Sequence, residues 1–436
     1  MAKEIPPVPL KDYLTGLPRL KVVKEPVDPK LEVSAALLSD PYHTLWFQGT
    51  GSHSLVGNLW PNRSAIAEYF RVAASELPDL LLHALENPTP PKLVKDKIAW
   101  RAREEPDLSK LPVPQFYPKD AGNYLTASIF SSFWKGKRNL SYHRFWVKGP
   151  GGGPIRLVPR HLDRMYREAK KESIELPVEI IVGAPPEVLL AAACSIDYAT
   201  DEMDVASALH QRRTGKPLQV VELENGTRVP AEAEIVIDAV ITHKEEREGP
   251  FLDVLGTYDA ERVQPVVRVE KVHTVEDPVL YNIVPGSEEH FLLMGLPKEP
   301  FIMHSVRSVV PGVKAVRLTE GGCGWLNGVV SIQKRRDGDG KNAITAAFAG
   351  HASLKHVTVV DSDVDIFNDR DVEWAVATRF QADKGLVVVT GATGSTLDPS
   401  ATKDGITTKW GIDATLPIGA PRDPYIKENF PKERSA

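Results

Sequence analysis

Two carboxylates lie close together in the segment Glu248–Asp253, which reads Glu-Gly-Pro-Phe-Leu-Asp. Side chains at this separation diverge on a helix and point to opposite faces of a flat strand, so only a bend can direct both acids into one cavity. Gly249-Pro250 supplies such a bend. Two carboxylates that share a partly dry site ionise at different pH values, and one of them can then carry a proton. The segment predicts general acid chemistry; the alternative is a solvated acidic turn, because the charged run Lys244–Arg247 precedes it.

Arg144 stands at the start of an otherwise apolar run, Phe145-Trp146-Val147. An unpaired guanidinium in such a strand would be costly, because burial removes the water that solvates its charge. If Arg144 is buried, it therefore needs an anion beside it.

Three residues could hold a metal ion without sulfur: Asn139 at the entry to a strand, His161 at the start of a helix, and the acid Glu202. An amide oxygen, an imidazole and a carboxylate suit Mn2+ or Mg2+ and leave positions for phosphate oxygens. A lone histidine at a helix start is more often a capping or packing residue. Spacing alone leaves both interpretations open.

The composition is that of an ordinary globular protein, with 42% hydrophobic and 25% charged residues in a chain of 436. This length favours two or three domains. A net charge of −5 provides no basic field, so nucleic acid is not an expected partner. No apolar run is long enough to span a membrane, and residues 3–7 lack the apolar core of a signal peptide, so we expect a cytoplasmic protein. With two cysteines, Cys194 and Cys323, neither a disulfide framework nor a thiolate metal site is expected.

The apolar pattern divides the chain into three parts that must position these residues. Residues 1–105 alternate helical and strand-like segments and end in a charged stretch. Residues 106–298 contain many short Val- and Ile-rich runs between Gly and Pro turns, which favour a barrel or closed sheet. Residues 299–436 return to alternating strands and helices and predict an α/β domain.

Individual elements follow from the same pattern. In the central part we expect strands at Arg144–Lys148, Ile155–Val158, Val178–Val182, Leu218–Leu223, Glu234–Thr242 and Val266–His273, with helices near 160–172 and 185–195. In the last part we expect strands at Val313–Leu318, Gly328–Gln333, His356–Val360 and Leu386–Thr390, with helices at Asn342–His351 and Asp371–Ala382.

These segments occur in the order found in the UbiD-like decarboxylases, and the chain resembles a shorter, archaeal-type member of that family. The most specific similarities are Glu248–Asp253, the pattern Val-Pro-Ala-x-x-Glu-Ile at Val229–Ile235, and Thr319–Cys323 leading into Val329–Ile332. The resemblance implies reversible, non-oxidative decarboxylation of an α,β-unsaturated, aromatic or heteroaromatic acid through a covalent adduct with prenylated FMN, with Mn2+ and K+. It also implies a flavin prenyltransferase as supplier of the cofactor. Some archaeal-type members act on an anhydromevalonate phosphate, which is the alternative substrate.

The resemblance also implies a mixed α+β and α/β multidomain fold. An N-terminal α/β part would precede a flavin-reductase-like split β-barrel that binds the cofactor, and a C-terminal α/β oligomerisation domain would follow. These expectations agree with the division at 1–105, 106–298 and 299–436. A homodimer or homohexamer is expected.

Carried over by position, the resemblance assigns roles to individual residues. The metal ligands are Asn139, His161 and Glu202, and the catalytic network is Arg144, Glu248 and Asp253. Within that network we expect Glu248 to deliver the proton that replaces CO2, with Asp253 as its partner. The implied cofactor-binding residues are Asn139, Ser141, Arg144, Arg160, His161, Ser195 and Lys355. The chain departs from many members at Phe133–Arg138, where they have an Asp-Pro-Glu-Thr-Gly turn near the mouth of the cofactor site.

The segment Phe301–Arg307 bears on substrate choice. His304 and Arg307 could recognise a second anionic group, such as a carboxylate or a phosphate. The alternative is an ordinary surface helix, since residues three apart on a helix are neighbours.

Two other functions compete with decarboxylation. An ordinary FMN-dependent oxidoreductase would need the barrel and the phosphate site but not the acid pair. A metal-dependent hydrolase would use Asn139, His161 and Glu202 to hold a metal-bound water.

Overall fold

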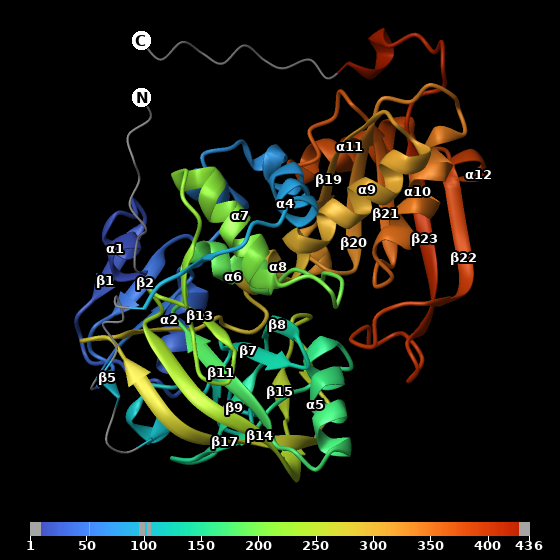
Figure 1. The fold of residues 1–436 in the computed structure, drawn as a ribbon. Coiled ribbons are helices and arrows are strands. Elements are labelled where there is room, and N and C mark those ends of the chain that lie inside the picture. The colour runs from blue at the N-terminus through green and yellow to red at the C-terminus, as the bar shows by residue number, and fades with distance from the viewer. Residues whose placement is uncertain (1–9, 52, 96–100, 103–105, 427–436) are drawn as a thin grey trace, which may run out of the picture. The chain divides into compact units, whose positions relative to one another are not determined.

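The computed structural model describes residues 10–51, 53–95, 101–102 and 106–426. The chain forms two compact units, residues 1–297 and 298–436 (Figure 1). Buried apolar clusters lie within each of them. The three-part division of the sequence stays a prediction, because its first boundary falls beside residues 103–105, which lie outside the described residues.

The first unit begins with a small mixed sheet of strand order β1-β2-β3-β18. β1 is parallel to β2, β2 is antiparallel to β3, and β3 is parallel to β18. Because β18 comes from near the end of the unit, this sheet joins the two ends of the unit's chain. The elements of this region are α1 (Leu10–Thr15), β1 (Leu20–Val23), α2 (Glu32–Ser39), β2 (Thr44–Phe47), β3 (Ser54–Gly57), α3 (Arg63–Phe70), α4 (Leu77–Glu86), β18 (Val279–Tyr281) and α8 (Glu288–Gly295).

A larger antiparallel sheet of order β10-β17-β14-β11-β7-β8 forms the centre of the first unit, and the short β5 also pairs with β17. Within the described residues no strand pairing closes this sheet into a barrel. Its members are β5 (Arg101–Ala102), β7 (Ile129–Trp134), β8 (Lys137–Tyr142), β10 (Gly152–Pro154), β11 (Leu176–Val182), β14 (Ile235–Glu248) and β17 (Arg262–Thr274). Short pairs flank it: β4 (Lys92–Leu93) and β13 (Arg228–Pro230) on β12 (Gln219–Glu222), β6 (Asn123–Leu125) with β9 (Phe145–Val147), and β15 (Phe251–Leu252) with β16 (Tyr258–Asp259).

β14 is longer than the predicted strand Glu234–Thr242. Its second half contains the charged run Lys244–Arg247 and pairs with the start of β17 after a register shift that follows Ile241. His243–Arg247 is exposed or half-buried, whereas Glu248 at the end of the strand is fully buried. This extension is what carries one of the two predicted acids into the interior.

The strand predicted at Ile155–Val158 is wrong. The strand β10 ends at Pro154. Ile155 makes an isolated bridge to Phe145, and its N–H donates to the carbonyl of Pro265 at 3.1 Å. The backbone N–H of Leu157 instead donates to the side chain of Gln264 at 2.7 Å. The chain then turns into a helix, because Pro159 has no N–H to give to a sheet.

β8 is contacted by three helices, α5 (His161–Lys171), α6 (Pro186–Ala192) and α7 (Glu202–Thr214). The first two were predicted. α7 was not, although Asp201 caps it by accepting from the N–H of Met203, and Gly215 ends it at a φ of +77°. Within the described residues, no helix combines the length and apolar character that a membrane span requires.

β7 and β8 are joined by a two-residue turn, Lys135-Gly136, with φ values of +48° and +77°. Two positive φ angles are typical of the tight turn that matches the twist of a hairpin. The segment Phe133–Arg138, where the chain departs from many relatives of similar pattern, is therefore a tight hairpin.

The second unit is an α/β domain, as predicted. Its sheet has the order β19-β20-β21-β23-β22, with β20, β21 and β23 parallel. Its elements are α9 (Glu299–Val309), β19 (Val313–Leu318), β20 (Asn327–Ile332), α10 (Asp339–Gly350), β21 (His356–Asp361), α11 (Asp369–Arg379), α12 (Ala382–Gly385), β22 (Leu386–Thr393) and β23 (Ile406–Ala414). The strand β23 lies beyond the predicted elements.

Candidate active site

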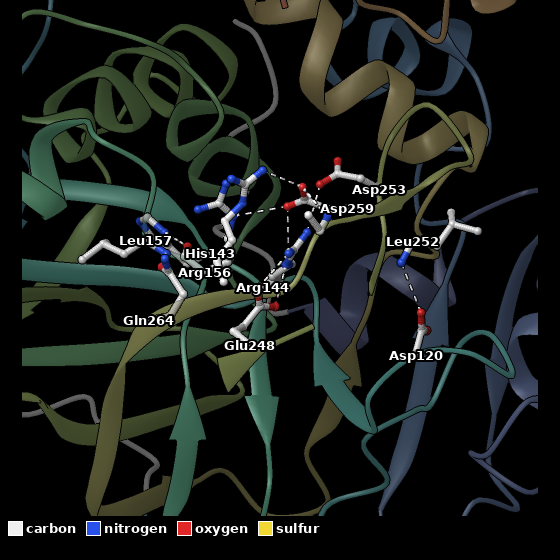
Figure 2. Close-up of polar contacts among 12 residues, drawn as sticks. Asp120, His143, Arg144, Arg156, Leu157, Glu248, Leu252, Asp253, Asp259 and Gln264 are labelled. Atoms are coloured by element: carbon white, nitrogen blue, oxygen red, sulfur yellow. Dashed lines mark hydrogen bonds and ion pairs between the residues drawn. The ribbon is translucent and has the colours of Figure 1, made fainter. Parts of the chain in front are cut away.

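Arg144 lies between β8 and β9 and binds three carboxylates (Figure 2). Its Nε donates to Oε1 of Glu248 and its NH2 to Oε2, both at 2.8 Å. Its NH1 donates to Oδ2 of Asp253 at 3.0 Å, and NH2 also donates to Oδ2 of Asp259 at 3.1 Å. Three carboxylates therefore supply the negative charge that was predicted beside Arg144.

The Gly-Pro bend brings Glu248 and Asp253 to one guanidinium, as the sequence indicated. Glu248 ends β14, Gly249 turns the chain at a φ of +93°, and Phe251 starts β15. The Phe251 ring lies 4.7 Å from the guanidinium carbon of Arg144. The two acids differ in exposure: the side chain of Glu248 is 0% exposed and that of Asp253 is 22% exposed.

Asp259 was missed from the sequence. It stands on β16, directly across from Phe251 on β15. Its Oδ1 accepts from NH2 of Arg262 at 2.9 Å, and its Oδ2 lies 3.4 Å from Nε of Arg156. Burial acts to raise the pKa of Asp259, but Arg262, Arg144 and Arg156 outweigh it and hold the pKa below its usual value. The only local signal was an acid three residues before an arginine.

Two further residues beside this network were also missed. Tyr124 is buried with its ring centroid 4.4 Å from that of Phe251, and burial, with Glu248 adding to it, raises the pKa of its hydroxyl. His290 on α8 accepts a hydrogen bond at Nδ1 from the N–H of Gly286 at 3.1 Å. Burial lowers the pKa of His290, with Asp253 opposing and Arg144 reinforcing that effect. The lowered pKa favours the neutral imidazole form of His290.

Two of the three predicted metal ligands are in direct contact. Oε1 of Glu202 accepts from Nδ2 of Asn139 at 3.1 Å, and Oε2 accepts from the N–H of Leu140 at 2.9 Å. His161 is the first residue of α5, and its ring lies 5.2 Å from that of Tyr198. α5, which begins with His161, and α7, which begins with Glu202, both contact the strand that carries Asn139.

The chemistry of these residues fits a hard divalent cation. Burial raises the pKa of Glu202 to about 8, so a bound cation would return this carboxyl to its charged form. The pKa of His161 is lowered by burial and by Arg160 and Arg164, which favours the neutral imidazole that binds metals. No cluster of three or more His, Cys, Asp or Glu side chains suited to a metal lies in the described part of the chain. The predicted set instead needs the amide of Asn139 as its third donor.

Several predicted cofactor residues also lie together. NH1 of Arg160 donates to Oγ of Ser195 at 2.9 Å, at the residue that precedes the first turn of α5. A helix start with an arginine and a hydroxyl suits a phosphate. Oγ of Ser141 donates to Oδ1 of Asn139 at 2.9 Å and lies 2.9 Å from Nε2 of His143.

The remaining predicted residues belong to the second unit. Nζ of Lys355 pairs with Oδ2 of Asp398 at 2.7 Å and also donates to Ser400. His304 and Arg307 lie exposed on α9, where NH2 of Arg307 contacts Sδ of Met303 at 3.0 Å. Their roles toward cofactor and substrate stay predictions.

Comparisons with known proteins identify the family of the chain. A model described as the 3-octaprenyl-4-hydroxybenzoate carboxy-lyase Rift-related domain matches residues 89–288, and the C-terminal domain of the same carboxy-lyases matches 291–414. An anhydromevalonate phosphate decarboxylase of Methanocaldococcus jannaschii is 41% identical over 418 residues, which span 94% of this chain and 97% of that relative.

Solved structures of UbiD-class enzymes share the fold. The UbiD-class enzyme HmfF from Pelotomaculum thermopropionicum, in complex with FMN, superposes with a TM-score of 0.92 at 37% identity and covers 97% of each chain. An evolved dimeric form of that enzyme, in complex with prFMN, superposes with a TM-score of 0.86 at 35% identity and covers 96% of this chain and 98% of the other.

Proposed function

Because the chain belongs to the UbiD family of carboxy-lyases and is a decarboxylase, we propose that its substrate is the α,β-unsaturated acid anhydromevalonate phosphate and its cofactor prenylated FMN. The substrate proposal rests on the relative that matches nearly the full length of the chain. Aromatic and heteroaromatic acids are the other members of the expected class.

The observation that carries the chemistry is the unequal pair of acids on Arg144. Glu248 is fully buried and takes two hydrogen bonds from the guanidinium, which makes it an anchor. Asp253 takes one bond from the guanidinium, accepts a second at Oδ1 from the N–H of Val254, and is partly exposed, so it is the acid that can exchange a proton with substrate and solvent. This reverses the order expected from the sequence, in which Glu248 was to deliver the proton.

The residues of this chain would then divide the work as follows. Arg144 would orient the substrate carboxylate, and Phe251 and Tyr124 would exclude water from that side. Prenylated FMN, when bound, supplies the electron sink that accepts the bond electrons as CO2 leaves. Asp253 would give its proton to the carbon that loses CO2 and would regain one from solvent for the next turnover.

Asn139, His161 and Glu202 would hold Mn2+, and Arg160, Ser141 and Ser195 would bind the cofactor phosphate. The family resemblance also implies K+ as a further cofactor and a role for Lys355 in binding the flavin. The large sheet of the first unit would be the cofactor-binding split barrel. A flavin prenyltransferase would supply the cofactor, and the second unit would mediate assembly into a homodimer or homohexamer.

The test is to co-express the chain with a flavin prenyltransferase, with Mn2+ and K+ present, and to identify the released cofactor by mass spectrometry. The holoenzyme should release CO2 from anhydromevalonate phosphate and should act poorly on the same acid without its phosphate. Release of CO2 only from aromatic acids would refute the substrate proposal. Plain FMN with NAD(P)H oxidation and no CO2 from any acid would refute the cofactor proposal.

A further inference from the structure

Asp259 engages a hydrogen-bond donor of Arg144 that the two predicted acids leave over. A guanidinium has five N–H donors. Nε and NH2 bind Glu248, NH1 binds Asp253, and the second N–H of NH2 binds Asp259. Among the described residues, this leaves one N–H, on NH1, for a substrate carboxylate.

Asp259 is itself held firmly in place. Its side chain is 7% exposed, and its backbone is fixed by the pairing of β16 with β15. Its Oδ1 accepts from NH2 of Arg262 and from the N–H of Ala260, both at 2.9 Å, and Arg156 lies on its other oxygen. Because these partners fix the carboxylate of Asp259, it restricts the position of the Arg144 guanidinium that it binds.

We propose that Asp259 is a positioning residue for decarboxylation. It holds NH2 of Arg144 on Glu248, so that Asp253 keeps a single hydrogen bond with the guanidinium and can still carry the proton that it delivers to the substrate. Arginine and carboxylate prefer a two-bond geometry. Without Asp259, NH2 has a vacant N–H, and the NH1–NH2 edge can take both oxygens of Asp253. That contact would stabilise the ionised form of Asp253, while the second N–H of NH1 would stay available for the substrate carboxylate.

This inference rests on the proposed role of Asp253. In that role the Oδ–H bond of Asp253 breaks, its proton forms the new C–H bond where CO2 has left, and the carboxylate is reprotonated from solvent. The charged and titratable groups that face Asp253 are Arg144, Glu248 and Asp259 in the network and His290 on α8. Of these, Asp259 is the one whose removal changes the contact between Arg144 and Asp253 while leaving both residues in place.

The test compares Asp259→Asn and Asp259→Glu with Asp253→Asn in the holoenzyme, with anhydromevalonate phosphate as the probe. Glu175→Gln is the matched control, because it removes an exposed carboxylate paired with Arg268 elsewhere in the same unit. Asp259→Asn should lower kcat about tenfold and shift the alkaline limb of the pH profile about one unit toward acid pH, because a more firmly ionised Asp253 loses its proton at lower pH. Asp259→Glu should recover part of both effects.

A crystal structure of Asp259→Asn gives a second readout that does not depend on activity, with Asp259→Ser as the variant to use if the asparagine protein does not fold. Arg144 should make two hydrogen bonds to Asp253 in place of one. An unshifted pH limb together with an unchanged single contact would overturn the inference. If Asp253→Asn keeps full turnover, the role of Asp253 fails instead; if it is inactive while Asp259→Asn behaves like the control, the positioning role alone fails.

Discussion

Asp253 and Glu248 bind the same guanidinium, but Glu248 is fully buried and accepts two of its hydrogen bonds, whereas Asp253 is partly exposed and accepts one. Substitution of Asp253 should therefore affect mainly turnover, and substitution of Glu248 mainly stability. Asp253→Asn keeps the size of the side chain and removes its proton. Turnover should fall by roughly a thousandfold, which is the scale of a lost general acid, while cofactor content and thermal stability stay close to wild type. Glu248→Gln should instead lower the free energy of unfolding by roughly 3 kcal/mol, because Arg144 is left buried without its main anion.

Steady-state kinetics and thermal unfolding of the two holoenzyme variants measure this contrast. Glu261→Gln is a suitable control, because Glu261 is an exposed acid near the same turn. Wild-type turnover by Asp253→Asn would remove this residue from the mechanism. Loss of turnover without loss of stability in Glu248→Gln would identify Glu248 as the proton donor.

The sequence could predict part of this site because part of it is local. Glu248 and Asp253 share one bend, and an arginine in an apolar strand implies an anion. Asp259 and His290 could not be found in this way, since one lies across a strand pair and the other on a helix from later in the chain. The order of the two acids also depends on burial, which spacing does not reveal.

At the scale of elements, β11 and β14 place two carboxylates directly opposite each other, Glu179 and Asp238. Burial, with Asp238 adding to it, raises the pKa of Glu179 to about 9. Burial acts to raise the pKa of Asp238 as well, but hydrogen bonds with His273 and Glu179 lower it on balance. Glu179 is therefore protonated at neutral pH and bonds to an ionised partner across the sheet.

This pair predicts a pH-dependent stability with a defined sign. The pKa of Glu179 is higher in the folded chain than its ordinary value of 4.5, so the folded state binds the extra proton. Its contribution is complete below the unfolded pKa and is lost as the pH rises toward about 9. Glu179→Gln should match wild type near pH 5 and exceed it in unfolding free energy by roughly 2 kcal/mol or more near pH 9.

Denaturant unfolding across this pH range, with Glu224→Gln as the exposed control, measures the difference. A constant offset between Glu179→Gln and wild type would show that Glu179 is ionised throughout. Other buried acids, such as Glu289, also titrate in this pH range and change the stability of every variant. The quantity to compare is therefore the difference in unfolding free energy between Glu179→Gln and wild type at each pH.

Helices and strands could be predicted from the sequence where their local apolar spacing alone determines them. α5 lies where it was expected, and β11 ends where expected but begins two residues earlier, at Leu176. The second half of β14 and the position of β10 are decided by their partner β17, which no local pattern contains. The closure of a barrel is likewise a property of strand partners, and the sequence could state it only through the family resemblance.

At the scale of the whole molecule, the sheet of the second unit ends in an edge strand, β22. β22 contacts β23 on one side and is the edge of the sheet in the described residues. Val388 on β22 lies opposite Trp410 on β23, and their side chains are 54% and 38% exposed. Exposed apolar residues on an edge strand favour pairing with another chain. This is the surface through which we expect the predicted homodimer or homohexamer to assemble.

Val388→Lys places a charge on this edge, and charged residues on edge strands oppose such pairing. The variant should therefore have a smaller mass than wild type in size-exclusion chromatography with light scattering, measured on the holoenzyme. Val22→Lys is the matched control, since Val22 is 42% exposed on a strand of the first unit. A reduced mass in Val388→Lys but not in Val22→Lys would locate self-association on the β22 edge. An unchanged oligomer in both would assign assembly to another surface, and the apolar side chains of β22 would then need a different occupant.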